Sequence, residues 1–390
     1  MLWHYQTANR YSVFSTAPTV VGNRVYISTG NALYALDATT GKARWQQHWG
    51  AYNNSSNAVP VVVGNVVYIV AIDGSLHALD TSTGKELWAK AVDLATYIVP
   101  GQSATKGLLY LLQGFTLHTI DARTGAELWQ TSLLTTGESS SSFQIMDAIV
   151  AQNAVYTSFS YYNGGGVFSA VDAKSGKQLW STQLEKGYQF FHLLANNALV
   201  YMVATPLAAG KSFYEAAYAT KTGSQLWTVS TDSEILDEPV LDNGLLYLNM
   251  QNGYTYAVNA QSGKKVWTYH ANGDVNLSTV NNGTFYVEVG DAHIQENKQR
   301  MADGQLAFTP HYIVALNKNG GEVRRYNVPQ GLYPGLLVVG NSTIYLVGET
   351  TLNFEEFHVF SALKGSNGAQ LWQQKIKNLP PSGANTVVIP

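Results

Sequence analysis

The sequence repeats one short pattern from near its beginning to near its end, and such a repeat restricts the chain to a small set of architectures. The pattern is A-x-D-x-x-x-G-x-x-x-W, as in YALDATTGKARW, which ends at Trp45, and HALDTSTGKELW, which ends at Trp88. It returns about every 47 residues, the length of four short strands with their turns. Related segments end at Trp129, Trp180, Trp227, Trp267, Arg325 and Trp372. Eight copies predict an all-β fold, an eight-bladed β-propeller of four-stranded antiparallel blades.

Each residue of the pattern has a physical role in such a blade. Glycine can adopt the positive φ that closes a short hairpin, and the aspartate four residues earlier can accept hydrogen bonds from amides of the turn. The alanine lets a neighbouring sheet approach, and the tryptophan fills the space that widens between two blades. The predicted structural tryptophans are Trp45, Trp88, Trp129, Trp180, Trp227, Trp267 and Trp372. The predicted turn glycines are Gly41, Gly84, Gly125, Gly176, Gly223, Gly263, Gly321 and Gly368.

The segment before each copy supplies two further strands. One carries a tyrosine at a fixed place, and runs such as VVYIVA are apolar on both faces, which suits a sheet covered on each side by another blade. These tyrosines are Tyr26, Tyr68, Tyr110, Tyr156, Tyr201, Tyr247, Tyr286 and Tyr345.

Composition excludes several classes of protein. Charged residues make up 13% of the chain, the net charge is −3, and no basic stripe of the kind that binds nucleic acid is present. The chain contains no cysteine, which excludes disulfides, thiolate metal sites and a cysteine nucleophile. It also lacks an apolar run of about 18 residues, so we expect no membrane-spanning helix.

We expect residues 1–390 to form a single domain, with the ends 1–14 and 378–390 as closing or additional strands. Trp3 in MLWHYQT and the run GANTVVIP both resemble strands, although QLWQQK at Trp372 already supplies the outermost strand of the last blade. MLWHYQT has neither the basic nor the apolar region of a signal peptide. A closed ring leaves few unpaired strand edges, so we predict a monomer.

The repeat resembles the tryptophan-docking motif of the quinoprotein (pyrroloquinoline-quinone, PQQ) propellers, over roughly Ser15 to Lys377. It is similar also to the repeat of the lipoprotein scaffold in the bacterial outer-membrane barrel assembly machine and of extracytoplasmic sensor domains. The resemblance implies a bacterial, extracytoplasmic protein, secreted, periplasmic or anchored, whose signal or anchor is absent from this sequence. Quinoprotein dehydrogenases hold calcium and the quinone over the propeller axis. No compact set of acids and amides here matches their calcium ligands, so we expect no cofactor.

A binding site is predicted on the face that carries the loops between second and third strands and between blades. The longest of these connections fall in blades four, five, seven and eight, and blade seven inserts residues 290–311. The loops are rich in aromatic and amide side chains, which suit a peptide or a sugar ring, or else pack beneath the loops. The candidate ligand-binding residues are Tyr52, Asn54, Tyr97, Phe143, Tyr188, Phe190, His192, Asp237, Glu238 and Tyr333.

Catalytic motifs are missing from the sequence. It contains no G-x-S-x-G, H-E-x-x-H or P-loop pattern, and its nine histidines are scattered. One acidic group stands out between blades five and six, and it could bind Ca²⁺ or simply be solvated. It consists of Asp232, Glu234, Asp237 and Glu238.

We therefore predict a non-catalytic binding or scaffold propeller that presents its looped face to a protein, peptide or glycan. The alternatives are a quinoprotein dehydrogenase that uses PQQ and Ca²⁺, and a carbohydrate-active enzyme that uses acids such as Asp237 and Glu238.

Overall fold

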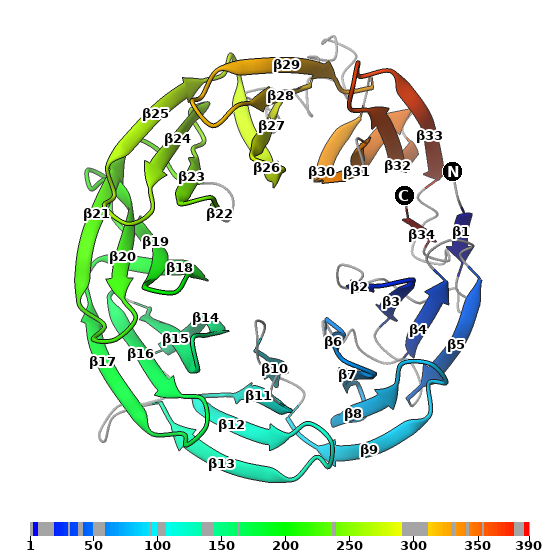
Figure 1. Ribbon diagram of the computed structural model, residues 1–390, viewed down its shortest axis with the longest axis vertical. Coiled ribbons are helices and arrows are strands. Elements are labelled where there is room, and N and C mark those ends of the chain that lie inside the picture. Colours follow the sequence, from blue (N-terminus) through cyan, green and yellow to red (C-terminus); the bar gives the residue numbers. More distant parts are fainter. Residues whose placement is uncertain are drawn as a thin grey trace.

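The computed structural model is a ring of eight four-stranded antiparallel sheets around a central axis (Figure 1), which confirms the predicted propeller. Every described element is a strand, a bridge or a turn, and none is a helix. The structure describes the following residues: 3–6, 19–29, 32–37, 42–49, 59–93, 96–99, 107–133, 143–162, 164–235, 239–290, 311–329, 332–340, 343–352, 355–377 and 386–389.

Each blade uses four consecutive strands, ordered from the axis outward. The first four blades contain β2 (Thr19–Val21), β3 (Arg24–Thr29), β4 (Ala32–Asp37), β5 (Ala43–His48); β6 (Val61–Val63), β7 (Val66–Ala71), β8 (Ser75–Asp80), β9 (Glu86–Ala91); β10 (Tyr97–Ile98), β11 (Leu108–Gln113), β12 (Thr116–Asp121), β13 (Glu127–Ser132); and β14 (Phe143–Ala151), β15 (Ala154–Tyr161), β16 (Gly166–Asp172), β17 (Gln178–Leu184).

The second half of the ring repeats the same order. Blades five to eight contain β18 (Tyr188–Ala195), β19 (Leu199–Pro206), β20 (Phe213–Ala219), β21 (Gln225–Thr231); β22 (Val240–Asp242), β23 (Leu245–Asn249), β24 (Tyr254–Asn259), β25 (Lys265–His270); β26 (Asp274–Asn281), β27 (Thr284–Gly290), β28 (Tyr312–Leu316), β29 (Glu322–Asn327); and β30 (Tyr333–Gly340), β31 (Thr343–Leu352), β32 (Glu355–Lys364), β33 (Gln370–Lys377).

The two ends of the chain form a small sheet of their own. β1 (Trp3–Gln6) pairs antiparallel with β34 (Thr386–Ile389), so neither strand joins a four-stranded blade. In Figure 1 this pair lies between blade eight and blade one. The terminal segments are thus additional strands at the seam of the ring, and β33 alone is the outermost strand of blade eight.

Tryptophan joins neighbouring blades as the sequence predicts. Gly84 has φ of +70°, and a Cβ at this position would lie 2.5 Å from Cδ2 of Trp45 in the preceding blade. Trp45 Nε1 donates a hydrogen bond to the carbonyl of Thr81 at 2.9 Å, which fixes the ring against the turn. The same contact between glycine and the preceding tryptophan occurs at Gly125, Gly176, Gly223 and Gly263. Gly41 and the side chain of Trp372 lie outside the described part of the structure.

The fixed tyrosine shares this inter-blade contact. The hydroxyl of Tyr68 and Nε1 of Trp88 both donate to the carbonyl of Ala122 in the next blade, at 2.8 and 3.1 Å. Burial raises the pKa of Tyr68 to about 12, with a smaller contribution from the charge of Asp121. The phenol is therefore neutral and able to donate at any physiological pH.

Blade seven departs from the predicted register by one residue. Its turn closes through the amide of Gly320 on the carbonyl of Asn317, three residues earlier, whereas Gly84 bonds to Asp80, four residues earlier. Gly320, with φ of +80°, therefore packs on Trp267, and Arg324 stands opposite Ala315 in the tryptophan position. The predictions for Gly321 and Arg325 were wrong because the turn is one residue shorter.

Tyr326 takes over the role of the missing tryptophan in blade seven. Its hydroxyl donates to the carbonyl of Gly365 at 2.8 Å, and a Cβ at Gly368 would lie 3.1 Å from its ring. The contact between blades seven and eight is thus made with a smaller aromatic ring from two residues further along the strand.

Candidate functional site

The looped face is built up where the innermost strands are long. β14 has nine residues and β18, β26 and β30 have eight each, whereas β2, β6 and β22 have three. β31 and β32 reach ten residues. The extra residues that the sequence places in blades four, five and eight therefore extend strands of these blades. Most of the blade-seven insertion, residues 291–310, lies outside the described residues.

Each of the four long inner strands is bent by a β-bulge. A bulge places an extra residue in one strand and turns the local side chains. The register shifts lie between Ile145 and Asp147, between Phe191 and Leu194, between Val275 and Leu277, and between Pro334 and Leu336.

The bulges of blades four and five are joined by one carboxylate. Oδ2 of Asp147 accepts a hydrogen bond from the amide of Leu193 at 2.7 Å, and Oδ1 accepts one from its own neighbour Ala148 at 2.7 Å. His192 has φ of +58°, a conformation that is costly for a residue other than glycine. The Asp147 bond therefore holds the half-buried Phe191 and His192 in a strained, fixed place.

Glycine-rich turns connect the same two blades. The amide of Gly165, in the turn between β15 and β16, donates to the carbonyl of Tyr188 in blade five at 2.7 Å. Within blade five, the amide of Leu207 donates to the carbonyl of Gly187 at 3.0 Å, which continues the pairing of β18 with β19. Gly166 must be glycine, because a Cβ there would lie 1.9 Å from the carbonyl oxygen of Phe159. The turns leave Tyr162 and Leu207 on the surface, 65% and 44% exposed.

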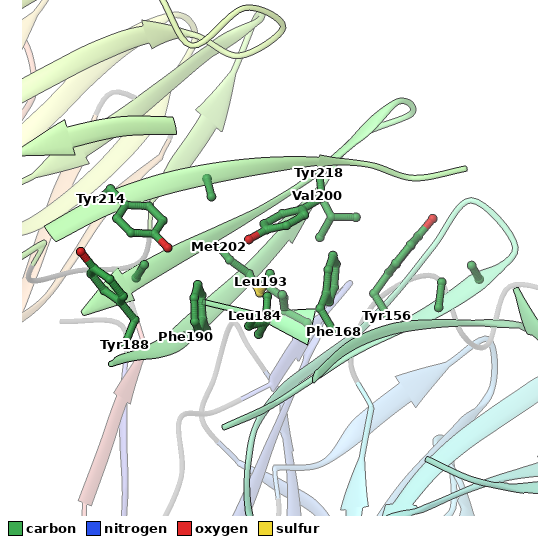
Figure 2. Packing of buried hydrophobic residues seen from close by; sticks show 14 residues of the cluster. Tyr156, Phe168, Leu184, Tyr188, Phe190, Leu193, Val200, Met202, Tyr214 and Tyr218 are labelled. Carbon is green, nitrogen blue, oxygen red and sulfur yellow. The ribbon is translucent and has the colours of Figure 1, made fainter. Parts of the chain in front are cut away.

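Two predicted ligand-binding residues lie in the core beneath these turns. Phe190 has no exposed surface and Tyr188 is 7% exposed, and both pack against Tyr214 (Figure 2). Lys211 places Nζ 4.7 Å above the Tyr188 ring and donates to the carbonyl of Lys186. The sequence could not distinguish exposed from buried aromatic side chains, because both kinds occur in apolar segments next to loops. A ligand on this face would meet the turns, while Phe190 supports them from below.

The other predicted residues are divided between surface and undescribed segments. Tyr97 is exposed at the start of β10, and His192 is half-buried at the bulge. Phe143 and Tyr333 begin β14 and β30, but their side chains lie outside the described part. Four further residues lie wholly outside it: Tyr52, Asn54, Asp237 and Glu238.

The structure also shows buried ionisable groups that sequence analysis missed. Glu288, with no exposed surface, lies 2.6 Å from Nδ1 of His311, so the pair brackets the blade-seven insertion. Glu215 is fully buried between blades five and six, and burial raises its pKa well above the ordinary value. A glutamate inside an apolar strand was the available signal in both cases.

Among the described residues, no three His, Asp or Glu side chains lie close enough to hold a metal ion. The described residues also include no helix long and apolar enough to cross a membrane.

The sequence matches the family model described as outer membrane protein assembly factor BamB, over residues 1–214 and again over 164–325. The chain belongs to this family. The crystal structure of BamB from Moraxella catarrhalis superposes with a TM-score of 0.53 at 16% identity, covering 89% of this chain and 96% of that one.

Relatives of the BamB-like chain carry two kinds of name. The outer membrane protein assembly factor BamB of Moranella endobia is 26% identical over 268 residues, which is 66% of this chain and 65% of the relative. The tetrathionate hydrolase of Acidithiobacillus ferrooxidans is 25% identical over 305 residues, which is 74% of this chain and 51% of the enzyme. The chain therefore spans about half to two thirds of the length of these relatives.

Proposed function

We propose that this BamB-like propeller is a non-catalytic scaffold outside the cytoplasm that binds a protein segment on its looped face and serves the assembly of outer-membrane proteins. Family membership supports the scaffold role. The observation that carries the position of the site is the joining of blades four and five by Asp147 and by the glycine turns, which holds a surface in place before any partner arrives.

A preformed surface favours binding, because little conformational entropy is lost when a partner docks. Tyr162 and Leu207 are exposed side chains beside the backbone bonds of Gly165 and Gly187, and Tyr97 adds an exposed aromatic in blade three. Aromatic rings of this kind are common anchors for peptide segments. Tyr52, Asn54, Asp237 and Glu238 remain proposals for the same face.

Site-specific photo-crosslinking in cells tests the position of the site. A photoreactive residue at Tyr97, Tyr162 or Leu207 is expected to capture one discrete protein partner, and the same residue at Leu128, half exposed on an outermost strand, is the control. Deletion of the gene should lower the amounts of outer-membrane proteins, and the unaltered chain should restore them. Capture from Leu128 alone, or unchanged amounts after deletion, would contradict the proposal.

The relationship to tetrathionate hydrolase supports a second candidate, a hydrolase acting on a polythionate. The buried pair of Glu288 and His311 beside the blade-seven insertion is the place where such chemistry would be sought, since a carboxylate can orient a histidine base. Purified protein incubated with tetrathionate decides this candidate. Turnover that is lost in His311→Gln while the fold is kept would favour the hydrolase over the scaffold.

The dehydrogenase alternative has its own measurement. A ligand that binds only the native state at about 100 times its Kd stabilises it by about 2.7 kcal/mol. We expect PQQ and Ca²⁺ together to leave the thermal midpoint of unfolding unchanged, whereas a clear rise would support a quinone site.

A further inference from the structure

The face opposite the looped face carries the turns between third and fourth strands. In successive blades the turn glycine packs against the tryptophan of the preceding blade, so these turns occupy equivalent places around the ring. The turns between first and second strands lie on the same face. Their carbonyls at Asn153, Ala198 and Gly244 accept bonds from amides of the third-to-fourth turns. We call this surface the turn face.

The turn face has an uneven distribution of charge. In blades four to eight, the third-to-fourth turns span residues 172–178, 219–225, 259–265, 317–322 and 364–370. They contain seven exposed lysines, Lys174, Lys177, Lys221, Lys264, Lys265, Lys318 and Lys364. Only Asp172 and Glu322 oppose them there, and the described first-to-second turns of these blades add only Asp242. The chain as a whole has a net charge of −3, whereas these five turns together are positively charged. We call the seven lysines of these turns the cationic arc.

Blades one to three lack this excess. The corresponding turns, residues 37–43, 80–86 and 121–127, contain three cations and five carboxylates. The three cations are Lys42, Lys85 and Arg123. The cationic arc therefore covers one side of the turn face only. The positive charge on this face is unevenly distributed around the ring.

The two carboxylates within these five turns already have other interaction partners. Asp172 accepts bonds from the amide and hydroxyl of Ser175, and Glu322 is paired with Arg325 at 2.9 Å. Among the described residues, none of the seven lysines forms a salt bridge, although Lys265 lies over the ring of Tyr256. Their charges are thus available to an external anion.

A half-exposed apolar residue follows each of these turns at the third place after its glycine. These residues are Leu179, Leu226, Val266, Val323 and Leu371, each between 51% and 60% exposed. Cations beside exposed aliphatic side chains suit the interface of a lipid bilayer. The five turns contain no aromatic residue on which a nucleic-acid base could stack.

We propose that the turn face of blades four to eight binds the surface of a bilayer that contains anionic phospholipid. Lysines spread over five hairpin tips match a planar anionic surface better than a pocket, and each is expected to strengthen binding to such a surface about five-fold. Binding in this way leaves the looped face directed away from the lipid. The scaffold is then oriented with its partner site free.

Sedimentation with lipid vesicles tests the proposal. The protein is expected to bind vesicles of phosphatidylcholine with about one third phosphatidylglycerol, and not vesicles of phosphatidylcholine alone. Raising the salt from about 50 to about 300 mM should weaken binding strongly, because surface charges are then screened.

A pair of matched triple variants keeps the test specific. Lys177→Gln, Lys221→Gln and Lys264→Gln together should weaken vesicle partitioning by up to about 100-fold. Lys42→Gln, Lys85→Gln and Arg123→Gln remove the same charge from the other side and should weaken it much less. Equal thermal midpoints show that both variants fold. No binding to anionic vesicles, equal loss in both variants, or binding of duplex DNA in place of vesicles would each overturn the proposal.

Discussion

Single residues in this propeller show how burial and local bonds move the ionisation of the same carboxyl group in opposite directions. Glu215 lies between Val203 and Val229 with no exposed surface, and both of its oxygens lack a hydrogen-bond partner among the described residues. Asp80 lies in an exposed turn and accepts bonds from Ser82 and Thr83. Burial disfavours the anionic form of Glu215, whereas the hydrogen bonds favour the anionic form of Asp80.

Glu215 is expected to make the fold less stable as the pH rises. Burial raises its pKa in the folded state above the unfolded value, so its contribution is fully present below the unfolded pKa and is lost as the pH rises toward the folded pKa. Within that window, Glu215→Gln should gain stability over the parent by at most about 1.4 kcal/mol for each pH unit. Chemical denaturation at several pH values measures this, and a difference that does not change with pH would contradict it.

Asp80 is expected to act in the opposite direction. Hydrogen bonds from Ser82 and Thr83 lower its pKa from 3.8 to about 2, so its stabilising effect is present above pH 4 and is lost as the pH falls through about 2. Asp80→Asn should therefore unfold more easily than the parent at neutral pH and equally easily near pH 2. Thermal unfolding across this range checks the expectation, with Asp232→Asn as an exposed control.

At the scale of the element, the hairpin turn decides which residue meets the next blade. In blade seven the turn closes over three residues, and Gly320, in place of Gly321, has positive φ and contacts Trp267. The backbone geometry of the turn determines which glycine contacts the tryptophan of the preceding blade. The residue spacing of the sequence pattern identifies that glycine only when the turn has its usual length.

The two neighbouring glycines provide a matched comparison. Gly320→Ala combines positive φ with a Cβ 2.6 Å from the Trp267 ring and should cost at least about 1–3 kcal/mol. Gly321→Ala places its Cβ 2.9 Å from the amide nitrogen of the Asn317 side chain, has no positive φ to strain, and should cost less. Urea denaturation of both variants measures the difference. A larger loss in Gly321→Ala would show that the turn closes as the sequence pattern suggests.

At the scale of the whole molecule, the two ends of the chain meet at the seam of the ring. The β1–β34 sheet lies at the seam between blade eight and blade one and pairs strands from opposite ends of the sequence (Figure 1). Blades four and five, by contrast, share packed side chains and backbone bonds (Figure 2). The seam is therefore the place where local opening is expected first.

Removal of residues 1–6 tests this expectation. Strand β34 would lose its partner, and its amides should exchange with solvent quickly, whereas amides of β15 and β19 should keep their protection. Hydrogen exchange measured by mass spectrometry separates these regions. If β34 keeps its protection in the shortened chain, the pairing of the two ends is not what orders the seam.

The sequence by itself determined the blades, because a glycine turn, an alanine and a tryptophan recur at nearly constant spacing and each has a local physical cause. It also indicated that blades four, five and eight carry additional residues, and the longer second and third strands of these three blades agree with this. Only the tertiary structure decided that Phe190 and Tyr188 lie beneath the looped face, that Tyr326 replaces a tryptophan, and that Glu215 is buried with no hydrogen-bond partner among the described residues. These features depend on which side chains from distant blades meet, and a pattern read along one strand contains no information about the blade that covers it.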